Sequence, residues 1–126
     1  MRLLLDTATF IYAIEVPERL SKRAASALRN AENILELSAV SISEIAIKSA
    51  LGKLKLSADI IRDSIRDLDI RIISYTSEHA LRLFTVPVHH RDPFDRQIIA
   101  QALAEKIPVV TPDEKFRLYS GLRIIW

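Results

Sequence analysis

Short apolar runs alternate with segments of helical periodicity along the whole chain of 126 residues, and no other feature limits the fold as strongly. The pattern predicts strands over 2–5, 34–40, 70–75, 107–111 and 122–126. The intervening helices are predicted over 9–15, 17–31, 45–51, 58–68, 77–85, 93–106 and 113–118. Strands that alternate with helices form a parallel sheet with helices on both faces. We therefore expect an α/β fold with a central, mostly parallel sheet of about four or five strands.

The composition indicates a single domain over residues 1–126. Hydrophobic residues make up 49% of the chain, and no Pro-rich, Ser-rich or singly charged block marks a linker. The lack of cysteine excludes disulfides, thiolate catalysis and cysteine-based metal sites. No apolar run reaches the roughly 18 residues of a membrane span, so we expect a cytoplasmic protein without a membrane partner. The net charge of +2 permits a nucleic-acid partner but does not argue strongly for one.

Acidic residues stand at the ends of the predicted strands. Asp6, Glu44 and Asp113 each follow one of these strands. Asp92 and Asp95 lie at the start of the helix that leads into the strand before Asp113. Because the carboxyl ends of parallel strands meet at one edge of a sheet, we expect these carboxylates to converge there.

Each acid also has a purely structural explanation when it is taken alone. Asp6 and Asp92 can cap helices, and Ser41-Ile42-Ser43-Glu44 has the spacing of a capping box before the helix predicted over 45–51. Asp113 can serve as a turn residue. Convergence of all the acids at one edge favours a functional site instead, because their mutual repulsion would destabilise the fold unless a cation offset it.

The available ligands limit the cation and its chemistry. Carboxylate oxygens without cysteine or clustered histidine suit Mg²⁺ or Mn²⁺. Such a cation activates water and neutralises charge on a phosphodiester, so metal-assisted phosphoryl hydrolysis is the natural chemistry. His89 and His90 do not argue for a different metal, since adjacent side chains diverge and no third His or Cys ligand is suitably placed. We expect this pair in the loop before the helix at Asp92.

Four motifs carry a family resemblance. They are Leu4-Leu5-Asp6-Thr7, then Ser43-Glu44-Ile45-Ala46-Ile47-Lys48 with Leu51-Gly52-Lys53-Leu54, then His89-His90-Arg91-Asp92-Pro93-Phe94-Asp95-Arg96 with Ile99-Ala100-Gln101-Ala102, and last Val110-Thr111-Pro112-Asp113. In this order they make the chain resemble a PIN domain over essentially its whole length. More narrowly, the chain is similar to the single-domain toxin of a VapBC-type toxin–antitoxin pair.

This resemblance implies a metal-dependent endoribonuclease that holds Mg²⁺ or Mn²⁺. The implied carboxylate ligands are Asp6, Glu44, Asp95 and Asp113. Asp92 competes with Asp95 for the third position, because many PIN domains place that acid one residue nearer the Ile-Ala pair, where this chain has Arg96. The chain departs from the family pattern at Ala8, where close relatives often have histidine, and at Pro112, where a basic residue is common.

Supporting roles follow for residues near the acids. The hydroxyls of Thr7 and Thr111 either orient the carboxylates or a metal-bound water, or make ordinary hydrogen bonds at the strand ends. Basic residues beside the motifs either contact RNA phosphates or are simply solvated; they are Lys48, Lys53, Arg91 and Arg96.

The resemblance also implies protein partners. One is a VapB-like antitoxin whose extended tail or helix covers the acidic edge and inserts a basic residue there. The other is a second copy of the chain, in a homodimer. Apolar residues that offer a surface for it, unless they pack in the core, are Ile11, Ile14, Ile45 and Ile47.

Other enzyme classes with an aspartate after the first strand fit less well. A haloacid-dehalogenase-type phosphatase needs a second acid two residues later, and that position is Ala8. A response-regulator receiver needs paired acids after the first strand and a lysine after a late strand, whereas Asp6 stands alone and no lysine follows Val110-Thr111. The alternative that stays open is the same fold used as a noncatalytic module that binds RNA or protein.

Overall fold

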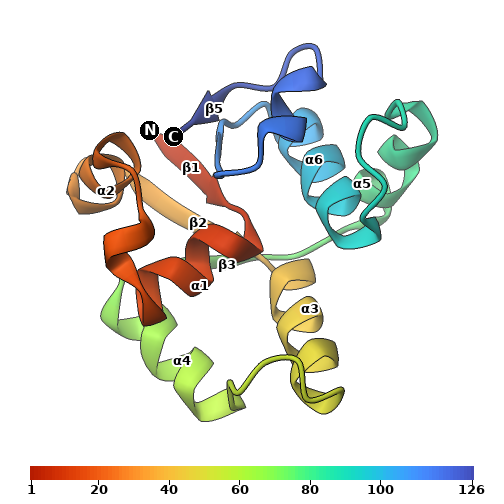
Figure 1. Ribbon diagram of the computed structural model, residues 1–126. Coiled ribbons are helices and arrows are strands. Elements are labelled where there is room, and N and C mark those ends of the chain that lie inside the picture. The colour runs from red at the N-terminus through yellow and green to blue at the C-terminus, as the bar shows by residue number, and fades with distance from the viewer.

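The computed structural model describes residues 1–126 and contains a five-stranded sheet in which all neighbouring strands are parallel. The strands are β1 (Arg2–Leu5), β2 (Ile34–Ser38), β3 (Arg71–Ile73), β4 (Val109–Val110) and β5 (Ile124–Ile125). Their order across the sheet is β3-β2-β1-β4-β5, so the first strand of the chain is the central one (Figure 1). The α/β fold predicted from the sequence is confirmed.

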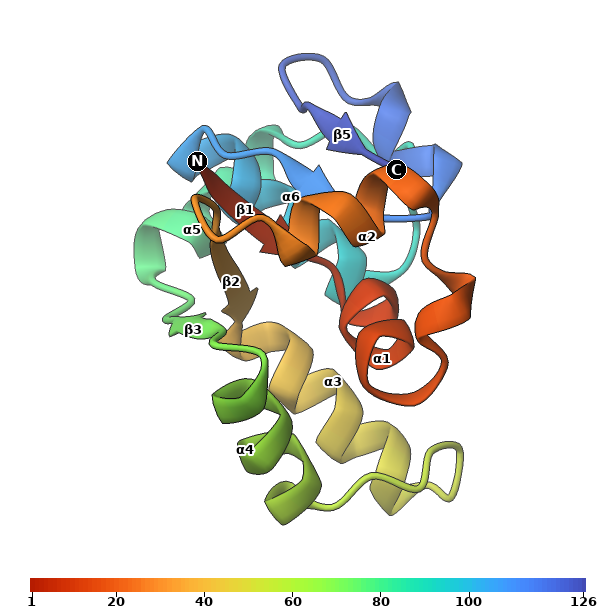
Figure 2. The ribbon, with the colours of Figure 1, turned by 90° about the vertical axis from the view of Figure 1, so that its left-hand side faces the viewer.

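Helices cover both faces of this sheet. They are α1 (Thr7–Glu15), α2 (Lys22–Arg29), α3 (Ala39–Ala50), α4 (Ala58–Asp67), α5 (Ser77–Arg82) and α6 (Pro93–Glu105). Three short 3₁₀ segments complete the chain, namely η1 (Pro17–Arg19), η2 (Leu83–Thr85) and η3 (Glu114–Leu118). Helices α1 and α2 lie on one side of the strands and α5 and α6 on the other (Figure 1), and Figure 2 views the molecule from the side of α1 and α2. None of the helices combines the length and the apolar character that crossing a membrane requires.

The central strand β1 contributes to two hydrophobic cores. Side chains alternate across a strand, so Leu3 and Leu5 face one side of the sheet and Leu4 the other. Leu3 and Leu5 belong to a cluster that includes Phe10 of α1, whereas Leu4 belongs to a cluster that includes Ile98 of α6. Because β1 is buried on both faces, the residue that follows it at the carboxyl end is also shielded from water.

Two helix starts differ from the sequence-based prediction because serine residues compete for the capping position. The expected helix over 17–31 is divided, since the Ser21 hydroxyl accepts the Ala24 N–H and starts α2 anew after η1. Helix α3 begins at Ala39 and not at residue 45, because Ser38 at the end of β2 caps it. The capping box predicted at Ser41 is therefore wrong: Ser41 lies inside α3.

The last three strands are shorter than predicted. Strand β3 at the edge pairs only with β2, over Arg71–Ile73, and β4 and β5 pair over two residues each. The short helix predicted over 113–118, after β4, is a 3₁₀ segment, η3, that Asp113 caps. These differences leave the crossovers unchanged, so the residues that follow β1, β2 and β4 still meet at one edge.

An ion pair on β1 and β2 holds the amino-terminal half of the two central strands together. The carboxylate of Glu36 is almost completely buried, and Arg2 Nε lies 2.6 Å from its Oε1. Arg2 Nη1 also lies 3.3 Å from Glu105 Oε2 on α6. A buried carboxylate needs such a partner, because its desolvation is costly when it stands alone.

Replacement of Arg2 by methionine should therefore lower the free energy of unfolding by roughly 1–3 kcal/mol, because Glu36 stays buried and loses its partner. Urea unfolding at neutral pH measures the change. Adding Glu36→Gln in the Arg2→Met background should restore much of the loss, since a neutral amide costs less to bury. Equal stability of the single and double variants would contradict this account.

Candidate functional site

The Asp6 carboxylate is held at the carboxyl end of β1 by two hydrogen bonds. Asp6 is 2% exposed and caps α1, with Oδ1 accepting the Thr9 N–H at 2.8 Å. Oδ2 accepts the Thr111 hydroxyl at 2.6 Å. Burial raises the pKa of Asp6 to about 6, although the hydrogen bonds from Thr111 and Thr9 oppose that shift. The carboxylate is thus rigidly placed in surroundings that disfavour its negative charge.

Glu44 has one satisfied and one unsatisfied carboxylate oxygen. It lies on α3 and is 5% exposed, and Oε2 accepts a hydrogen bond from Lys48 one turn later. Oε1 is buried and has no hydrogen-bond partner. Since nearly all buried polar atoms in folded proteins have a partner, this oxygen is a position where a donor or a cation would bind favourably.

Asp92 and Asp95 both lie at the start of α6, but their surroundings differ. Asp92 is the N-cap, and its Oδ1 accepts the N–H groups of Phe94 and Asp95 at 2.9 Å each. Burial, followed by the nearby charges of Asp92, Asp6, Glu44 and Asp113, raises the pKa of Asp95 to about 8. The pKa of Asp95 is therefore raised by the charges of all four other acids as well as by burial.

Asp113 follows β4 and caps η3. Its Oδ1 accepts the Lys115 N–H at 2.9 Å. Its own N–H donates to Thr111 Oγ1 at 3.0 Å, and the same hydroxyl donates to Asp6. Thr111 consequently links two acids that are far apart in the sequence, as expected if its hydroxyl orients them.

The five acids share one cavity of about 210 Å³ at the carboxyl edge of the sheet. Its lining residues are Asp6, Thr7, Ala8, Ile11, Glu44, Lys48, Asp92, Asp95 and Asp113. The expected convergence of carboxylates is thus observed. The hydrogen bond to Glu44 raises the pKa of Lys48, so the cavity keeps one ammonium group beside its acids.

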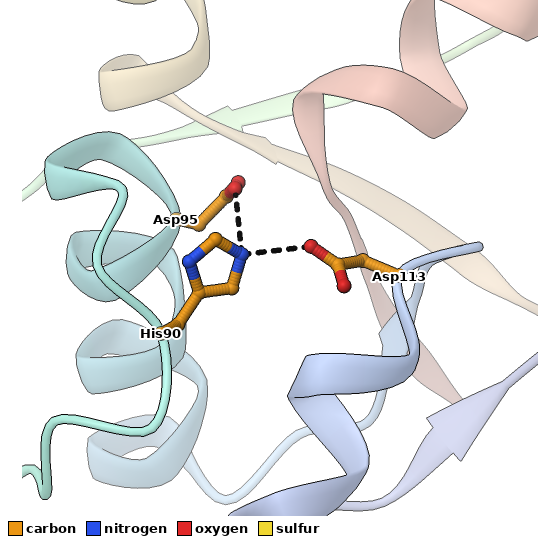
Figure 3. Close-up of side chains that lie close together, drawn as sticks. All are labelled: His90, Asp95 and Asp113. Carbon is orange, nitrogen blue, oxygen red and sulfur yellow. Dashed lines mark hydrogen bonds and ion pairs between the residues drawn. The ribbon is translucent and has the colours of Figure 1, made fainter.

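His90 is the residue at this edge that sequence reasoning missed. It lies in the loop before α6, as expected, but it is 6% exposed and its ring is directed into the site. His90 Nε2 lies 2.7 Å from Asp113 Oδ2 and 3.1 Å from Asp95 Oδ2 (Figure 3). These three residues can offer one ligand atom each within 4.8 Å of one another. The partners of His90 are carboxylates, and not the further His or Cys residues that a histidine pair suggests.

The other residues named from the sequence take varied positions. The Thr7 hydroxyl lines the cavity but donates to Ser41 Oγ at 2.9 Å, which ties α1 to α3. The Arg96 guanidinium donates to the backbone carbonyls of residues 86 and 87, so it supports the loop before α6. Lys53 and Arg91 are exposed and do not line the cavity.

Comparison with known families decides the classification. The family model described as the PIN domain matches residues 3–122. The chain belongs to the PIN domain family. No curated protein matches this PIN domain in sequence.

Solved structures share the fold of this PIN domain at low sequence identity. The domain resembles a chain of VapBC2 from Rickettsia felis bound to a promoter DNA fragment, with a TM-score of 0.72, 18% identity and coverage of 98% of this chain and 97% of that one. For a chain of DNA-bound VapBC from Salmonella typhimurium the TM-score is 0.68 and the identity 17%, with coverage of 98% of this chain and 96% of that one. For a chain of VapBC-5 from Mycobacterium tuberculosis, of the VapBC family of toxin–antitoxin systems, the TM-score is 0.61 and the identity 18%. The match covers 98% of this chain and 97% of that one.

The raised pKa of Asp95 predicts a pH-dependent stability. As pH rises from about 4 to about 8, the unfolded chain loses the Asp95 proton while the folded PIN domain retains it, so the free energy of unfolding falls. Asp95→Asn removes this penalty. In chelator-treated protein the variant should be more stable than the parent by on the order of 1–3 kcal/mol at pH 8, and the difference should vanish near pH 4.

Urea unfolding across this pH range measures the difference between variant and parent. Asp69→Asn is a matched control, because Asp69 is exposed and its φ of 52° lies in a region that asparagine tolerates. A stability gain for Asp95→Asn that stays constant with pH would contradict the assignment.

Proposed function

We propose that this PIN domain is a metal-dependent endoribonuclease and the toxin of a VapBC-type toxin–antitoxin pair. The observation that carries the proposal is the buried, unpartnered Oε1 of Glu44 in a cavity lined by four further carboxylates. Such an arrangement is destabilising by itself, and a bound cation would offset both the repulsion and the unsatisfied oxygen. Family membership and the likeness to VapBC chains support the same function.

The donor set fits Mg²⁺ or Mn²⁺. The residues that would hold the cation are Asp6, Glu44, Asp95 and Asp113. All offer carboxylate oxygens, which hard divalent cations prefer. When bound, the cation would neutralise charge on the scissile phosphodiester and promote attack by water.

Asp95 is the better candidate than Asp92 for the third acid. Asp92 Oδ1 is engaged with two backbone N–H groups as the cap of α6. Asp95 has no such duty, and its pKa is raised by burial and by every other acid of the cavity. The charge of an ionised Asp95 is therefore poorly compensated by the protein, and a bound cation would offset it.

The remaining residues of the chain keep these acids in place. Thr111 and the Thr9 N–H hold both oxygens of Asp6, and Lys48 holds one oxygen of Glu44. The ammonium group of Lys48 lines the cavity, so it would also attract a phosphate of the RNA.

Asp6→Asn and Glu44→Gln should each abolish metal-dependent RNA cleavage, with a loss of about 100-fold or more, because each removes a charged ligand. In the parent, millimolar Mn²⁺ should raise the midpoint of thermal unfolding, and this shift should shrink in both variants. The measurements are single-turnover cleavage of a labelled RNA and thermal unfolding with and without Mn²⁺.

Asp69→Asn, outside the cavity, should behave like the parent in both assays. If parent and Asp6→Asn leave RNA equally intact, and Mn²⁺ does not stabilise the parent, the chain is the noncatalytic binding module that the sequence left open.

The proposed antitoxin partner has a candidate surface next to the acids. Helices α3 and α4 enclose an apolar groove of about 220 Å³. Its lining residues are Ile42, Ile45, Ala46, Leu56, Ser57, Ala58, Ile61, Arg62 and Ile65. Helix α3 also carries Glu44 and Lys48, so a segment seated in the groove would lie beside the acidic cavity. A VapB-like chain that covers both would keep RNA from the acids.

Ala58→Glu should weaken binding of the cognate antitoxin at least tenfold, because it places a charge in the apolar groove at a position that a helix N-terminus tolerates. Ile60→Glu is the control, since Ile60 is on the same helix, is 45% exposed and does not line the groove. Isothermal titration with the purified antitoxin measures both. Equal loss of affinity in the two variants would remove the groove from the proposal.

A homodimer remains part of the proposal, but the surface expected for it changes. Ile45 is buried in the core, and Ile11 and Ile14 pack against that core, so that of the four expected residues only Ile47, at 47%, is exposed. Exposed apolar side chains gather instead along α5, η2 and the loop that follows, at Leu81, Phe84 and Val88. That stretch is the more suitable contact for a second copy.

A further inference from the structure

We propose that His90 is a positioning residue, which holds Asp95 and Asp113 at a fixed separation because its Nε2–H group lies between their carboxylates, and which does not itself bind the cation. The inference rests on the proposed nuclease function. His90 Nε2 lies between two carboxylates from different segments of the chain. It is 2.7 Å from Asp113 Oδ2 and 3.1 Å from Asp95 Oδ2.

The tautomer of His90 follows from its other nitrogen. The Asp92 N–H donates to His90 Nδ1 at 3.1 Å, so Nδ1 is an acceptor and carries no proton. A ring that accepts at Nδ1 carries its hydrogen on Nε2, which is hydrogen-bonded to Asp113 Oδ2 and lies 3.1 Å from Asp95 Oδ2. A metal ligand needs a lone pair at that nitrogen, so binding through Nε2 would require the ring to give up its bond from Asp92.

The ring is itself held firmly by its surroundings. It meets the ring of Phe116 edge to face, with centroids 5.8 Å apart and an interplanar angle of 90°. The hydroxyl oxygen of Tyr119, a buried residue, accepts the N–H groups of His89 and His90 at 3.2 Å and 2.8 Å. Backbone and ring of His90 are therefore both fixed before any cation arrives.

The two acids depend on this donor because little else joins them. Asp95 is on α6 and Asp113 is in the turn after β4, and the two carboxylates repel each other whenever both are ionised. Asp113 is held on its other oxygen by the Lys115 N–H, whereas the Asp95 carboxylate accepts no hydrogen bond and His90 Nε2, at 3.1 Å, is its ion-pair partner. Without His90 the Asp95 side chain is free to turn away, and the ligand spacing must be re-formed each time a cation binds.

The test compares two substitutions that each keep one half of the histidine. His90→Gln places an amide N–H near the former Nε2 and preserves the bridge, whereas His90→Asn places an oxygen near the former Nδ1 and preserves only the bond from Asp92. His89→Asn is the matched control, because His89 is exposed and does not contact the acids. Circular dichroism establishes that all three variants fold.

Mn²⁺ affinity, measured by calorimetry without RNA, should fall about tenfold in His90→Asn, remain within about threefold of the parent in His90→Gln, and be unchanged in His89→Asn. Pulsed electron paramagnetic resonance of the Mn²⁺-loaded parent should show no coupling to a histidine nitrogen. In the metal-free parent, ¹⁵N spectra of the histidine rings should show the hydrogen of His90 on Nε2.

Three outcomes would overturn the inference: parent-like affinity in His90→Asn, equal losses in His90→Asn and His90→Gln, or nitrogen coupling, which would make His90 a ligand. A parent that binds Mn²⁺ but leaves RNA intact contradicts the nuclease function and leaves the role of His90 standing. A parent that binds no Mn²⁺ overturns both, and the ¹⁵N spectra then report only whether the hydrogen-bonded bridge exists.

Discussion

Repulsion among carboxylates gathered at one edge of a buried parallel sheet is the constraint on which the rest of this structure depends. The order β3-β2-β1-β4-β5 places β1 in the centre, and Asp6, which follows this buried strand, is only 2% exposed. Four more acids then line the same small cavity. Burial and proximity together account for the direction of the pKa shifts of Asp6 and Asp95, because both effects disfavour the charged carboxylate.

The chain limits this repulsion by giving most of the acids a second, local function. Asp6, Asp92 and Asp113 each cap a helical segment, where backbone N–H groups and the helix dipole favour negative charge. Thr111, Lys48 and His90 supply further donors. Capping and ligand binding are therefore compatible: the helix N-terminus that stabilises a carboxylate also fixes its direction. The oxygen of Glu44 that no donor reaches is where this compensation stops.

The sequence predicted the positions of the acids better than the positions of the groups that hold them. An apolar run followed by an acid requires only that the strand end at the sheet edge, which is why Asp6 and Asp113 could be placed. The start of α3 could not be predicted, because both Ser38 and Ser41 can cap a helix. Only the point where β2 stops pairing with β3 decides between them. The position of His90 could not be predicted either, because it depends on a loop that folds against Tyr119. That contact joins residues far apart in the chain.

The distribution of basic residues adds a further constraint on substrate binding. A cavity rich in carboxylates repels the phosphates of RNA, and the positive charges near it are few. Arg96 is occupied with backbone carbonyls of the preceding loop, and Lys48 is paired with Glu44. The net charge of +2 is too small to reverse the local field of five acids. In the proposed nuclease the divalent cation therefore has two tasks, since the same charge that assists hydrolysis is also what allows a phosphodiester to enter the cavity.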